Sequence, residues 1–328
     1  MKLPAAGHGA RRLKAGVLGS GLGRGVGEDG GHQRRRVGRK RSCSSGGKLL
    51  ETIRLIDVGA RDGIDTRWAP FYSVLDVIAF EPDVIECARL NAAKWPYAVK
   101  HIPVALGAEN GLTSTLFVCK SPGCSSLLRP NLALVTEFAY ATEMEVVKEI
   151  PVALFRMDSI VQSQPDVIKL DTQGTELDVL KGAGDLLRGT LAVELEVEFV
   201  PQYVGQALFA DIDEFMRSQG FQLRGLRRTY WRNAAQYVHP FGGQLIHGDA
   251  LYFRPERMDC PKGHIVAAAY NQFDMLAQFG VRHLIPRRSA VVRALSGLLT
   301  GFPNRELRRF VDKLRSADAS NWHDPDFF

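Results

Sequence analysis

The stretch Arg54-Leu-Ile-Asp-Val-Gly-Ala-Arg-Asp-Gly63 decides the fold of this chain. Its apolar residues Leu55, Ile56 and Val58 have the length and composition of a short buried strand, which breaks at two glycines four residues apart. Glycine at such a break lets the backbone turn sharply and approach a bound ligand closely. The spacing differs from the three-glycine dinucleotide fingerprint G-x-G-x-x-G. The stretch therefore predicts a strand followed by a ligand-binding loop of another kind.

An acidic residue marks the end of a second apolar strand, about one strand-helix-strand unit further along the chain. Val77-Ile-Ala-Phe80 is followed directly by Glu81 and Pro82. A carboxylate at this position suits a ribose diol, whose hydroxyls donate hydrogen bonds to it in nucleotide-binding α/β folds. The ends of the two strands therefore predict a pocket for a nucleoside-like cofactor.

Four motifs follow one another along the chain: Asp57-Val-Gly-Ala-Arg-Asp-Gly63, Ala79-Phe-Glu-Pro82, Ile168-Lys-Leu-Asp-Thr-Gln-Gly-Thr-Glu176 and Val179-Leu-Lys-Gly-Ala183. In that order they resemble the FkbM-type S-adenosylmethionine-dependent methyltransferases, and the resemblance covers roughly Leu50 to Arg254. It implies the class I methyltransferase fold, a Rossmann-like α/β sandwich with a mostly parallel seven-stranded sheet, an antiparallel last strand and helices on both faces. It also implies S-adenosylmethionine as the cofactor and a hydroxyl group as the methyl acceptor.

Strand and helix patterns alternate from residue 50 onward, which indicates a parallel sheet with right-handed crossovers. Residues 121–144, which contain Pro122, Gly123 and Pro130, interrupt this alternation and are interpreted as an inserted hairpin and lid-like segment over the site. We expect sheet strands over 53–58, 77–80, 102–106, 167–170, 191–199, 221–226 and 250–253, further extended runs over 114–119 and 146–155, and helices over 66–72, 84–94, 177–187 and 207–219.

The composition divides the chain into three predicted regions. Residues 1–48 are rich in Gly, Arg and Ser and lack the apolar side chains needed to fold, so we predict a disordered basic tail. Residues 49–255 form the predicted methyltransferase domain. Residues 256–328 predict a helical extension packed on that domain or on a second copy of the chain, which would then be a homo-oligomer. Helical apolar spacing in this extension covers 264–279, 289–299 and 304–314.

Charge and cysteine usage narrow the class of protein. The net charge of the 328 residues is +6, but residues 1–48 hold 12 Lys and Arg against two acidic residues, so the remainder is mildly acidic. The five cysteines form no C-x-x-C pair, so the expected compartment is the reducing cytoplasm. No apolar stretch approaches the roughly 18–20 residues of a membrane span. We therefore expect a cytoplasmic protein without one.

The predicted cofactor-binding residues come from four strand ends. Asp57 would orient the glycine loop or accept a hydrogen bond from the cofactor's ammonium group, although an aspartate here also suits a turn cap. Glu81 would bind the ribose. Leu106 would contact the adenine, by analogy with the fold. The full predicted set is Asp57, Gly59, Ala60, Arg61, Gly63, Glu81, Pro82, Leu106 and Asp171.

Two strand ends supply the predicted catalytic residues. Asp171 ends the fourth strand, where it would act as a general base or fix the loop before the next helix. Gln173 stands where the family often has Glu, so this position cannot supply a base here. In Glu194-Leu-Glu-Val-Glu198 the carboxylates alternate on one face, which predicts a polar cleft or a solvent-exposed strand end. We expect Glu196 to accept the substrate hydroxyl, with Glu194 as the second candidate.

Metal chemistry is not predicted. The histidines His101, His239 and His247 are too scattered for a metal-binding spacing. Each is interpreted as a surface histidine or one whose hydrogen bonds are satisfied within the fold.

The leading hypothesis is an S-adenosylmethionine-dependent O-methyltransferase that acts on a sugar, a glycolipid or a related small molecule. The basic cluster at 34–41 suggests a nucleic-acid methyltransferase instead. Enzymes of this fold that methylate amino groups usually carry (Asp/Asn)-Pro-Pro-aromatic after the fourth strand, where this chain has Asp171-Thr-Gln-Gly. We therefore expect no nucleic-acid substrate. A non-catalytic cofactor-binding scaffold is the third hypothesis, and the intact glycine loop and Glu81 argue against it.

Overall fold

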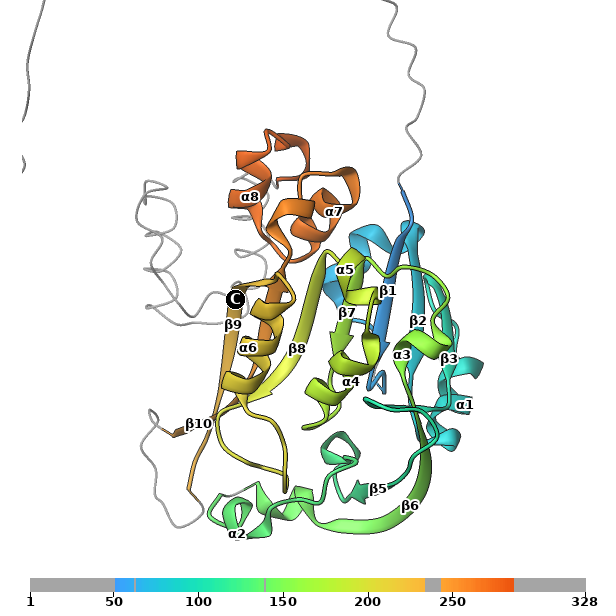
Figure 1. The fold of residues 1–328 in the computed structure, drawn as a ribbon, viewed down its shortest axis with the longest axis vertical. Helices are drawn as coiled ribbons and strands as arrows, with labels where there is room; N and C mark the ends of the chain where they lie inside the picture. Colours follow the sequence, from blue (N-terminus) through green and yellow to red (C-terminus); the bar gives the residue numbers. More distant parts are fainter. Residues whose placement is uncertain (1–50, 62, 139, 234–242, 286–328) are drawn as a thin grey trace, which may run out of the picture. The chain divides into compact units, whose positions relative to one another are not determined.

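The computed structural model describes residues 51–61, 63–138, 140–233 and 243–285. The predicted tail at 1–48 and the predicted helices at 289–299 and 304–314 lie outside these residues. The described chain is built around a seven-stranded sheet in the order β3-β2-β1-β7-β8-β10-β9 (Figure 1). Its strands are β1 (Ile53–Val58), β2 (Leu75–Phe80), β3 (Ala98–Ile102), β7 (Val167–Leu170), β8 (Ala192–Glu198), β9 (Gln222–Trp231) and β10 (Gln244–Phe253).

The strand directions confirm the predicted class I methyltransferase sheet. β1 pairs in parallel with both β2 and β7, and the pairs β2–β3 and β7–β8 are parallel as well. β10, the last of the strands in the described residues, inserts antiparallel between β8 and β9. Because the parallel strands end at one edge of the sheet, the loops after β1, β2, β7 and β8 meet there.

The predicted third strand at 102–106 is wrong. The sheet strand is β3, which ends at Ile102, and Pro103 separates it from β4 (Ala105–Leu106). Proline has no N–H to donate to a ladder, so it stands at the break between two strands. β4 instead pairs in parallel with β6 (Val146–Phe155) in a second, three-stranded sheet. β3 is half-exposed and lies at the edge of the main sheet. Because it contains polar residues, it could not be predicted as a run of apolar ones.

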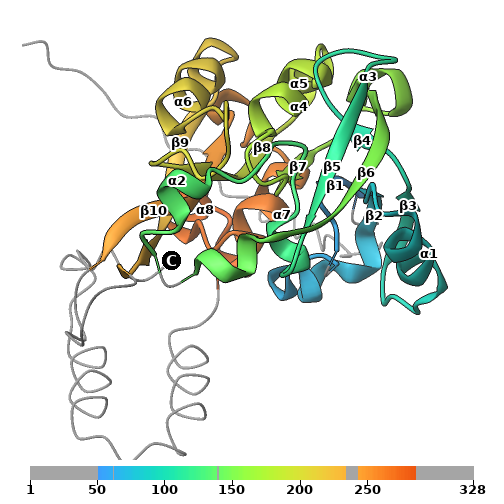
Figure 2. The same cartoon turned by 90° about the horizontal axis from the view of Figure 1, so that it is seen from below.

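Helices cover both faces of the main sheet (Figure 2). α3 (Met157–Ile160), α4 (Glu176–Ala183), α5 (Leu186–Gly189) and α6 (Phe209–Ser218) lie on one face. The other face carries the 3-10 helix η1 (Thr66–Val74), α7 (Pro261–Ala269) and α8 (Phe273–Gln278). α1 (Val84–Ala92) packs along β3, and the Asp83 side chain caps it by accepting hydrogen bonds from the N–H groups of Ile85 and Glu86.

The helix predicted over 177–187 is two helices. α4 ends before Gly184, whose φ of 51° is in the left-handed region, and α5 begins two residues later. A Cβ at Gly184 would lie 2.4 Å from the Asp158 carboxylate, so glycine is favoured at the break by a close contact as well as by the backbone conformation.

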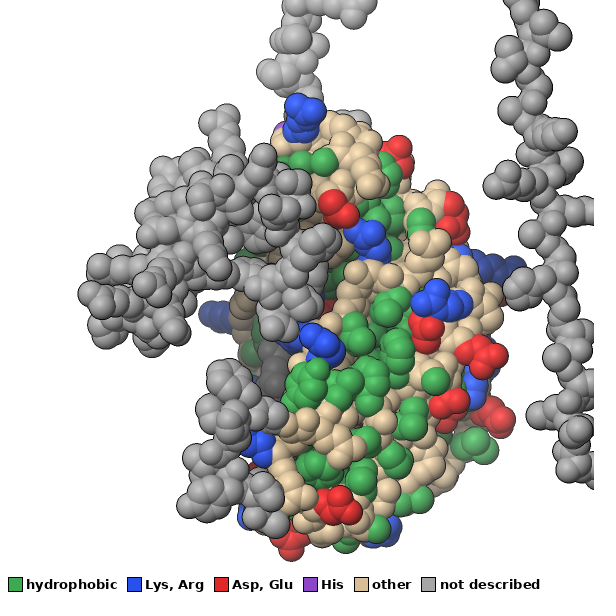
Figure 3. Space-filling model, turned by 90° about the vertical axis from the view of Figure 1, so that its left-hand side faces the viewer, with side chains coloured by type: hydrophobic (Ala, Val, Ile, Leu, Met, Phe, Trp, Pro, Cys, Tyr) green, Lys and Arg blue, Asp and Glu red, His purple; other side chains and the backbone are tan. Residues whose placement is uncertain are grey.

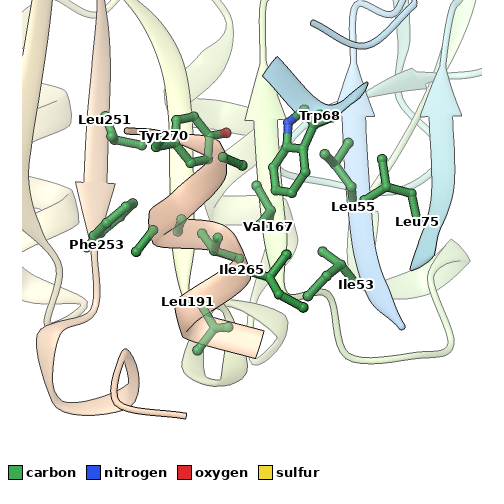
Figure 4. Close-up of a cluster of buried hydrophobic side chains, with 14 of the residues drawn as sticks. Ile53, Leu55, Trp68, Leu75, Val167, Leu191, Leu251, Phe253, Ile265 and Tyr270 are labelled. Carbon is green, nitrogen blue, oxygen red and sulfur yellow. The ribbon is translucent and has the colours of Figure 1, made fainter. Parts of the chain in front are cut away.

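The core beneath η1, α7 and α8 is apolar only along the amino-terminal halves of the strands. Trp68 of η1 packs edge-on against Tyr270, with their ring centroids 5.7 Å apart. Towards the carboxyl ends the same sheet face becomes charged, with Asp57 opposite Lys169 and Lys169 opposite Glu194 in the ladder. The buried apolar residues labelled in Figure 4 are Ile53, Leu55, Trp68, Leu75, Val167, Leu191, Leu251, Phe253, Ile265 and Tyr270.

The second sheet forms a roof over the carboxyl ends of the main strands (Figure 1). β6 pairs with β4 on one side and antiparallel with β5 (Thr113–Cys119) on the other. Between β5 and β6 the chain forms η2 (Pro122–Cys124), α2 (Leu132–Val135) and η3 (Ala141–Met144), which pack on a small core of their own. In the part of the chain described here, none of the helices is both long and apolar enough to cross a membrane.

Candidate functional site

A pocket opens between the roof and the carboxyl ends of β1, β2 and β7. Its empty space is about 840 Å³, open solvent included. The floor contributes Val58, Gly59, Arg61, Phe80, Glu81, Pro82, Asp83, Asp171, Thr172, Gln173 and Thr175, the chain around β4 contributes Val104, Ala105 and Leu106, and the roof contributes Leu116, Val118, Pro122, Gly123, Ser125, Ser126 and Leu127. The Ser126 hydroxyl donates a 2.7 Å hydrogen bond to the Gln173 carbonyl, which ties roof to floor.

The glycine loop after β1 is shaped by neighbouring backbone. Gly59 has a φ of 81° and donates its N–H to the Phe80 carbonyl at 3.0 Å. A Cβ on Gly59 would lie 1.9 Å from the carbonyl oxygen of Asp171. This glycine is required because two strand ends approach each other beneath the pocket, a reason that the sequence alone did not supply. Gly63, with a φ of 75°, packs against the ring of Trp95.

Glu81 is buried at the end of β2 and lines the pocket. Its Oε1 accepts a 2.9 Å hydrogen bond from the Asp83 N–H and lies 3.8 Å from the Arg61 guanidinium. Burial raises the pKa of the Glu81 carboxyl, and the Asp83 N–H and Arg61 oppose that rise. Among the described residues, the second oxygen, Oε2, has no hydrogen-bond partner. The pocket therefore contains a carboxylate that can accept a further hydrogen bond.

Asp57 and Lys169 form a buried ion pair next to the pocket. Asp57 is fully buried, with its Oδ1 3.3 Å from the Lys169 Nζ, while its Oδ2 has no partner. Burial raises the pKa of Asp57 even though Lys169 lowers it. Lys169 also lies 3.7 Å from Asp171. The sequence analysis missed Lys169, although a lysine inside the apolar strand Val167–Leu170 was a signal, because a buried lysine needs a charged partner.

A chain of polar side chains leads from the pocket to β10. Gln173 donates from Nε2 to Asp171 at 3.0 Å and to Glu196 at 2.5 Å, and its Oε1 accepts from the Tyr203 hydroxyl at 3.0 Å. The φ of Gln173 is 58°, an uncommon value outside glycine. The second oxygen of Glu196 lies 2.5 Å from the Nδ1 of His247. Burial raises the pKa of Glu196, and the hydrogen bond from His247 lowers it.

Glu194 and Glu196, predicted as similar candidates, have different surroundings. Glu194 lies 3.0 Å from the Arg67 guanidinium and accepts a 3.0 Å hydrogen bond from the Tyr270 hydroxyl. These partners hold it over the apolar core, whereas Glu196 is joined to the pocket through Gln173. Among the described residues that line the pocket, neither glutamate appears.

Two further carboxyl groups are buried beside this chain. Glu176 accepts hydrogen bonds from the N–H groups of Thr172 and Gly174, at 2.7 and 2.9 Å, so it closes the loop after β7. Burial raises the pKa of Glu176 to about 7. Glu198 is fully buried and neither of its oxygens has a partner. Burial, with Glu176 nearby, raises the pKa of Glu198 well above its usual value.

The predicted cofactor residues fall into two groups. Those that line the pocket are Gly59, Arg61, Glu81, Pro82, Leu106 and Asp171. Asp57, Ala60 and Gly63 are not among the described pocket-lining residues and support the floor from behind. The predicted lid-like segment 121–144 supplies Pro122 to Leu127 of the roof. The residues that the sequence reasoning did not single out are Lys169, Tyr203 and the β5 residues Leu116 and Val118. Their positions depend on contacts between segments far apart in the chain.

Basic and acidic side chains are interspersed around a band of hydrophobic ones on the face shown in Figure 3. A nucleic-acid backbone is tracked by a stripe of one sign of charge. The described residues on this face do not form such a stripe.

Comparison with known proteins identifies the domain. The sequence profile of the methyltransferase FkbM domain matches residues 57–223, about half of the chain. No curated protein gives a significant match. Among solved structures, a methyltransferase FkbM from Methylobacillus flagellatus KT is similar at 16% identity and a TM-score of 0.36, over 62% of this chain and 43% of that one.

Two further solved structures are similar at lower identity. Magnesium protoporphyrin IX methyltransferase from Synechocystis PCC 6803, with bound S-adenosylmethionine, is 10% identical with a TM-score of 0.33, over 63% of this chain and 72% of that one. TrmK from M. capricolum, in complex with S-adenosylhomocysteine, is 11% identical with a TM-score of 0.29, over 82% of this chain and 92% of that one. The chain thus spans less than half the length of the first of the three.

Proposed function

Because the chain belongs to the FkbM methyltransferase family, we propose that it transfers a methyl group from S-adenosylmethionine to a hydroxyl group of a sugar, a glycolipid or a related small molecule. The observation that carries the proposal is the Glu81 carboxylate, which stands in the pocket at the end of β2 with one oxygen unpartnered among the described residues. A ribose diol donates hydrogen bonds to a carboxylate in this position of the fold.

The residues present fit a nucleoside cofactor. Glu81 would accept from the ribose, Leu106 would supply an apolar wall for the adenine, and Asp171 would accept from the ammonium group of the methionine moiety. Asp57, although paired with Lys169, has a second buried oxygen behind the loop that can accept a further hydrogen bond. When bound, the cofactor supplies an electrophilic methyl group on a sulfonium centre.

The protein's own contribution is alignment and removal of a proton. Methyl transfer needs the acceptor oxygen in line with the methyl carbon and the sulfur, and holding two reactants in this geometry accelerates the step strongly. The roof lines the pocket with the apolar side chains of Leu116, Val118 and Leu127. The acceptor's proton is assigned to the polar side chains beyond Gln173, of which Glu196 is the first able to act as a base, because Gln173 joins them to the pocket.

The test begins with cofactor affinity. Glu81→Ala removes a charge-assisted hydrogen bond of roughly 1.5–3 kcal/mol, so the dissociation constant for S-adenosylhomocysteine should rise about 10- to 150-fold in calorimetric titration. Asp76→Ala is the matched control, because Asp76 lies at the other end of β2 with its side chain 52% exposed. Equal affinity in wild type and Glu81→Ala would mean that the ribose binds elsewhere.

The second part identifies the acceptor class. Wild-type protein is incubated with S-adenosylmethionine and either a panel of methyl glycosides or single-stranded RNA, and release of S-adenosylhomocysteine is measured. Release with glycosides and not with RNA is the expected result. Release with RNA alone would favour the nucleic-acid hypothesis.

A further inference from the structure

His247 of β10 is joined to the pocket by a continuous hydrogen-bonded chain. Its Nδ1 lies 2.5 Å from Glu196, whose other oxygen accepts from Gln173, and Gln173 lines the pocket. Both oxygens of Glu196 are therefore engaged. For Glu196 to take a proton from an acceptor, it would first have to give up one of these two contacts.

The backbone of β10 is irregular immediately before His247. The register with β9 shifts between Leu245 and His247, so Ile246 is an extra residue in the ladder. Such a bulge redirects the following side chains and is common beside active sites. Ile246 is fully buried, whereas His247 lies on the sheet face of Glu196 with 23% of its side chain exposed.

The other ring nitrogen of His247 is available. Among the described residues, Nε2 has no hydrogen-bond partner, and the orientation of Nδ1 towards a carboxylate indicates that Nδ1 carries the hydrogen. Nε2 then has a lone pair that can accept a proton. The ring of Trp231 stands edge-on at 6.0 Å, and the ring of Tyr140 lies 4.9 Å from Trp231. These aromatic rings form an apolar wall of the kind on which a sugar ring can rest.

We propose that His247, oriented by Glu196, is the general base that takes the proton from the acceptor hydroxyl; the inference rests on the proposed function and deepens it. The acceptor oxygen forms its bond to the methyl carbon as the carbon–sulfur bond breaks, and the bonding pair leaves with sulfur as the neutral thioether. The hydroxyl proton passes to Nε2. The resulting imidazolium is paired with Glu196 and later releases the proton to water, so one proton is produced for each methyl group transferred.

The charges around His247 suit this role. Burial of the ring lowers the pKa of His247, but Glu196, Asp249 and Asp171 raise it by more, so the pKa lies above its usual value. Asp249, on β10 itself, is neutralised by Arg227 of β9 at 2.7 Å. The direction of the pH dependence follows from this: the ring is protonated at low pH and becomes a competent base as the pH rises through its pKa.

A histidine that only neutralises Glu196 would give the same static contacts, so the test must separate the two roles. His247→Asn retains a nitrogen donor near the position of Nδ1 but has no base, so it preserves a structural contact and removes the chemistry. The matched control is His264→Asn, because His264 also pairs with a carboxylate, Asp259 at 3.0 Å, on the distant helix α7. Each variant is assayed for turnover of the methyl glycosides as a function of pH and for affinity towards S-adenosylhomocysteine.

The expected result is that wild-type turnover rises with pH through a value above about 6.5. His247→Asn should lose about 10²- to 10⁴-fold in turnover, together with that pH limb, while its S-adenosylhomocysteine affinity is unchanged. Full turnover with the wild-type pH profile in His247→Asn would overturn the inference and leave the proposed function standing. Absence of S-adenosylhomocysteine binding by the wild type would instead refute the proposed function.

A second measurement needs no acceptor. The ring protons of His247 are followed by NMR during a pH titration of the full chain, in wild type and in Glu196→Gln. The pKa should lie above about 6.5 in the wild type and fall in the variant, because the variant lacks the negative charge. A ring whose titration is the same in the wild type and in Glu196→Gln would overturn the inference that Glu196 orients His247, whatever the acceptor is.

Discussion

Replacing Lys169 by Met should destabilise the protein and make its stability fall more steeply as the pH rises. The substitution removes the cation 3.3 Å from Asp57, whose carboxylate is fully buried and already has one oxygen without a partner. Removing one partner of a buried ion pair costs about 3–5 kcal/mol. We expect the lower end, about 3 kcal/mol, because 25% of the Lys169 side chain is exposed.

The pH dependence follows from Asp57. Burial raises its pKa, with Lys169 opposing, so the variant raises it further. A carboxyl whose pKa is higher in the folded state keeps its proton after the unfolded chain has lost it, so the free energy of unfolding falls as the pH rises from about 4. The variant should therefore be closest to wild type in acid and furthest from it near neutrality.

Urea unfolding at pH 5 and pH 7 measures both effects. A loss of about 3 kcal/mol corresponds to a melting temperature roughly 6–12 °C lower for a chain of this size. Asp57→Asn combined with Lys169→Met leaves no buried charge at the pair, so the double variant should recover most of the loss. The control is Lys181→Met, whose exposed pair with Asp178 should contribute less than about 1 kcal/mol. A single variant within 1 kcal/mol of wild type, or a double variant as unstable as the single one, would refute the reasoning.

Two other substitutions test the same region. Glu198→Met should raise the free energy of unfolding at pH 7 by about 1–3 kcal/mol in urea titrations, because both carboxyl oxygens of Glu198 are buried without partners; a less stable variant would mean that an unseen partner satisfies them. Gly59→Ala should yield little folded protein by circular dichroism even in the presence of S-adenosylhomocysteine, because its Cβ would lie 1.9 Å from the Asp171 carbonyl; a normally folded variant would show that the two strand ends can separate.

Much of the main sheet could be predicted from the sequence because its central strands are apolar runs with clear ends. β1 and β7 begin and end where the patterns placed them, as does β6 of the second sheet. β9 and β10 are longer than predicted, because Arg227, Arg228, His247 and Asp249 continue these strands with polar side chains. A strand predicted from a run of apolar residues stops at the first polar ones, whereas the backbone pairing of the strands continues through them.

The site could be predicted only in outline. The alternation of Glu194 and Glu196 correctly placed both side chains on one sheet face. Their partners, Arg67 for the first and His247 for the second, come from η1 and β10, so no local pattern could separate their roles. The predicted strand at 102–106 was wrong for a local reason. Pro103 interrupts it, and the two residues of β4 that follow pair with β6 in the second sheet.

The roof is built as a separable part of the molecule. β4, β5 and β6 exchange their ladder hydrogen bonds with one another and none with the seven-stranded sheet. A change in length or sequence between Thr113 and Phe155 therefore alters the wall of the pocket without removing a ladder hydrogen bond of the main sheet. In evolutionary terms, the pocket wall and the main sheet can therefore vary independently in their ladder pairing.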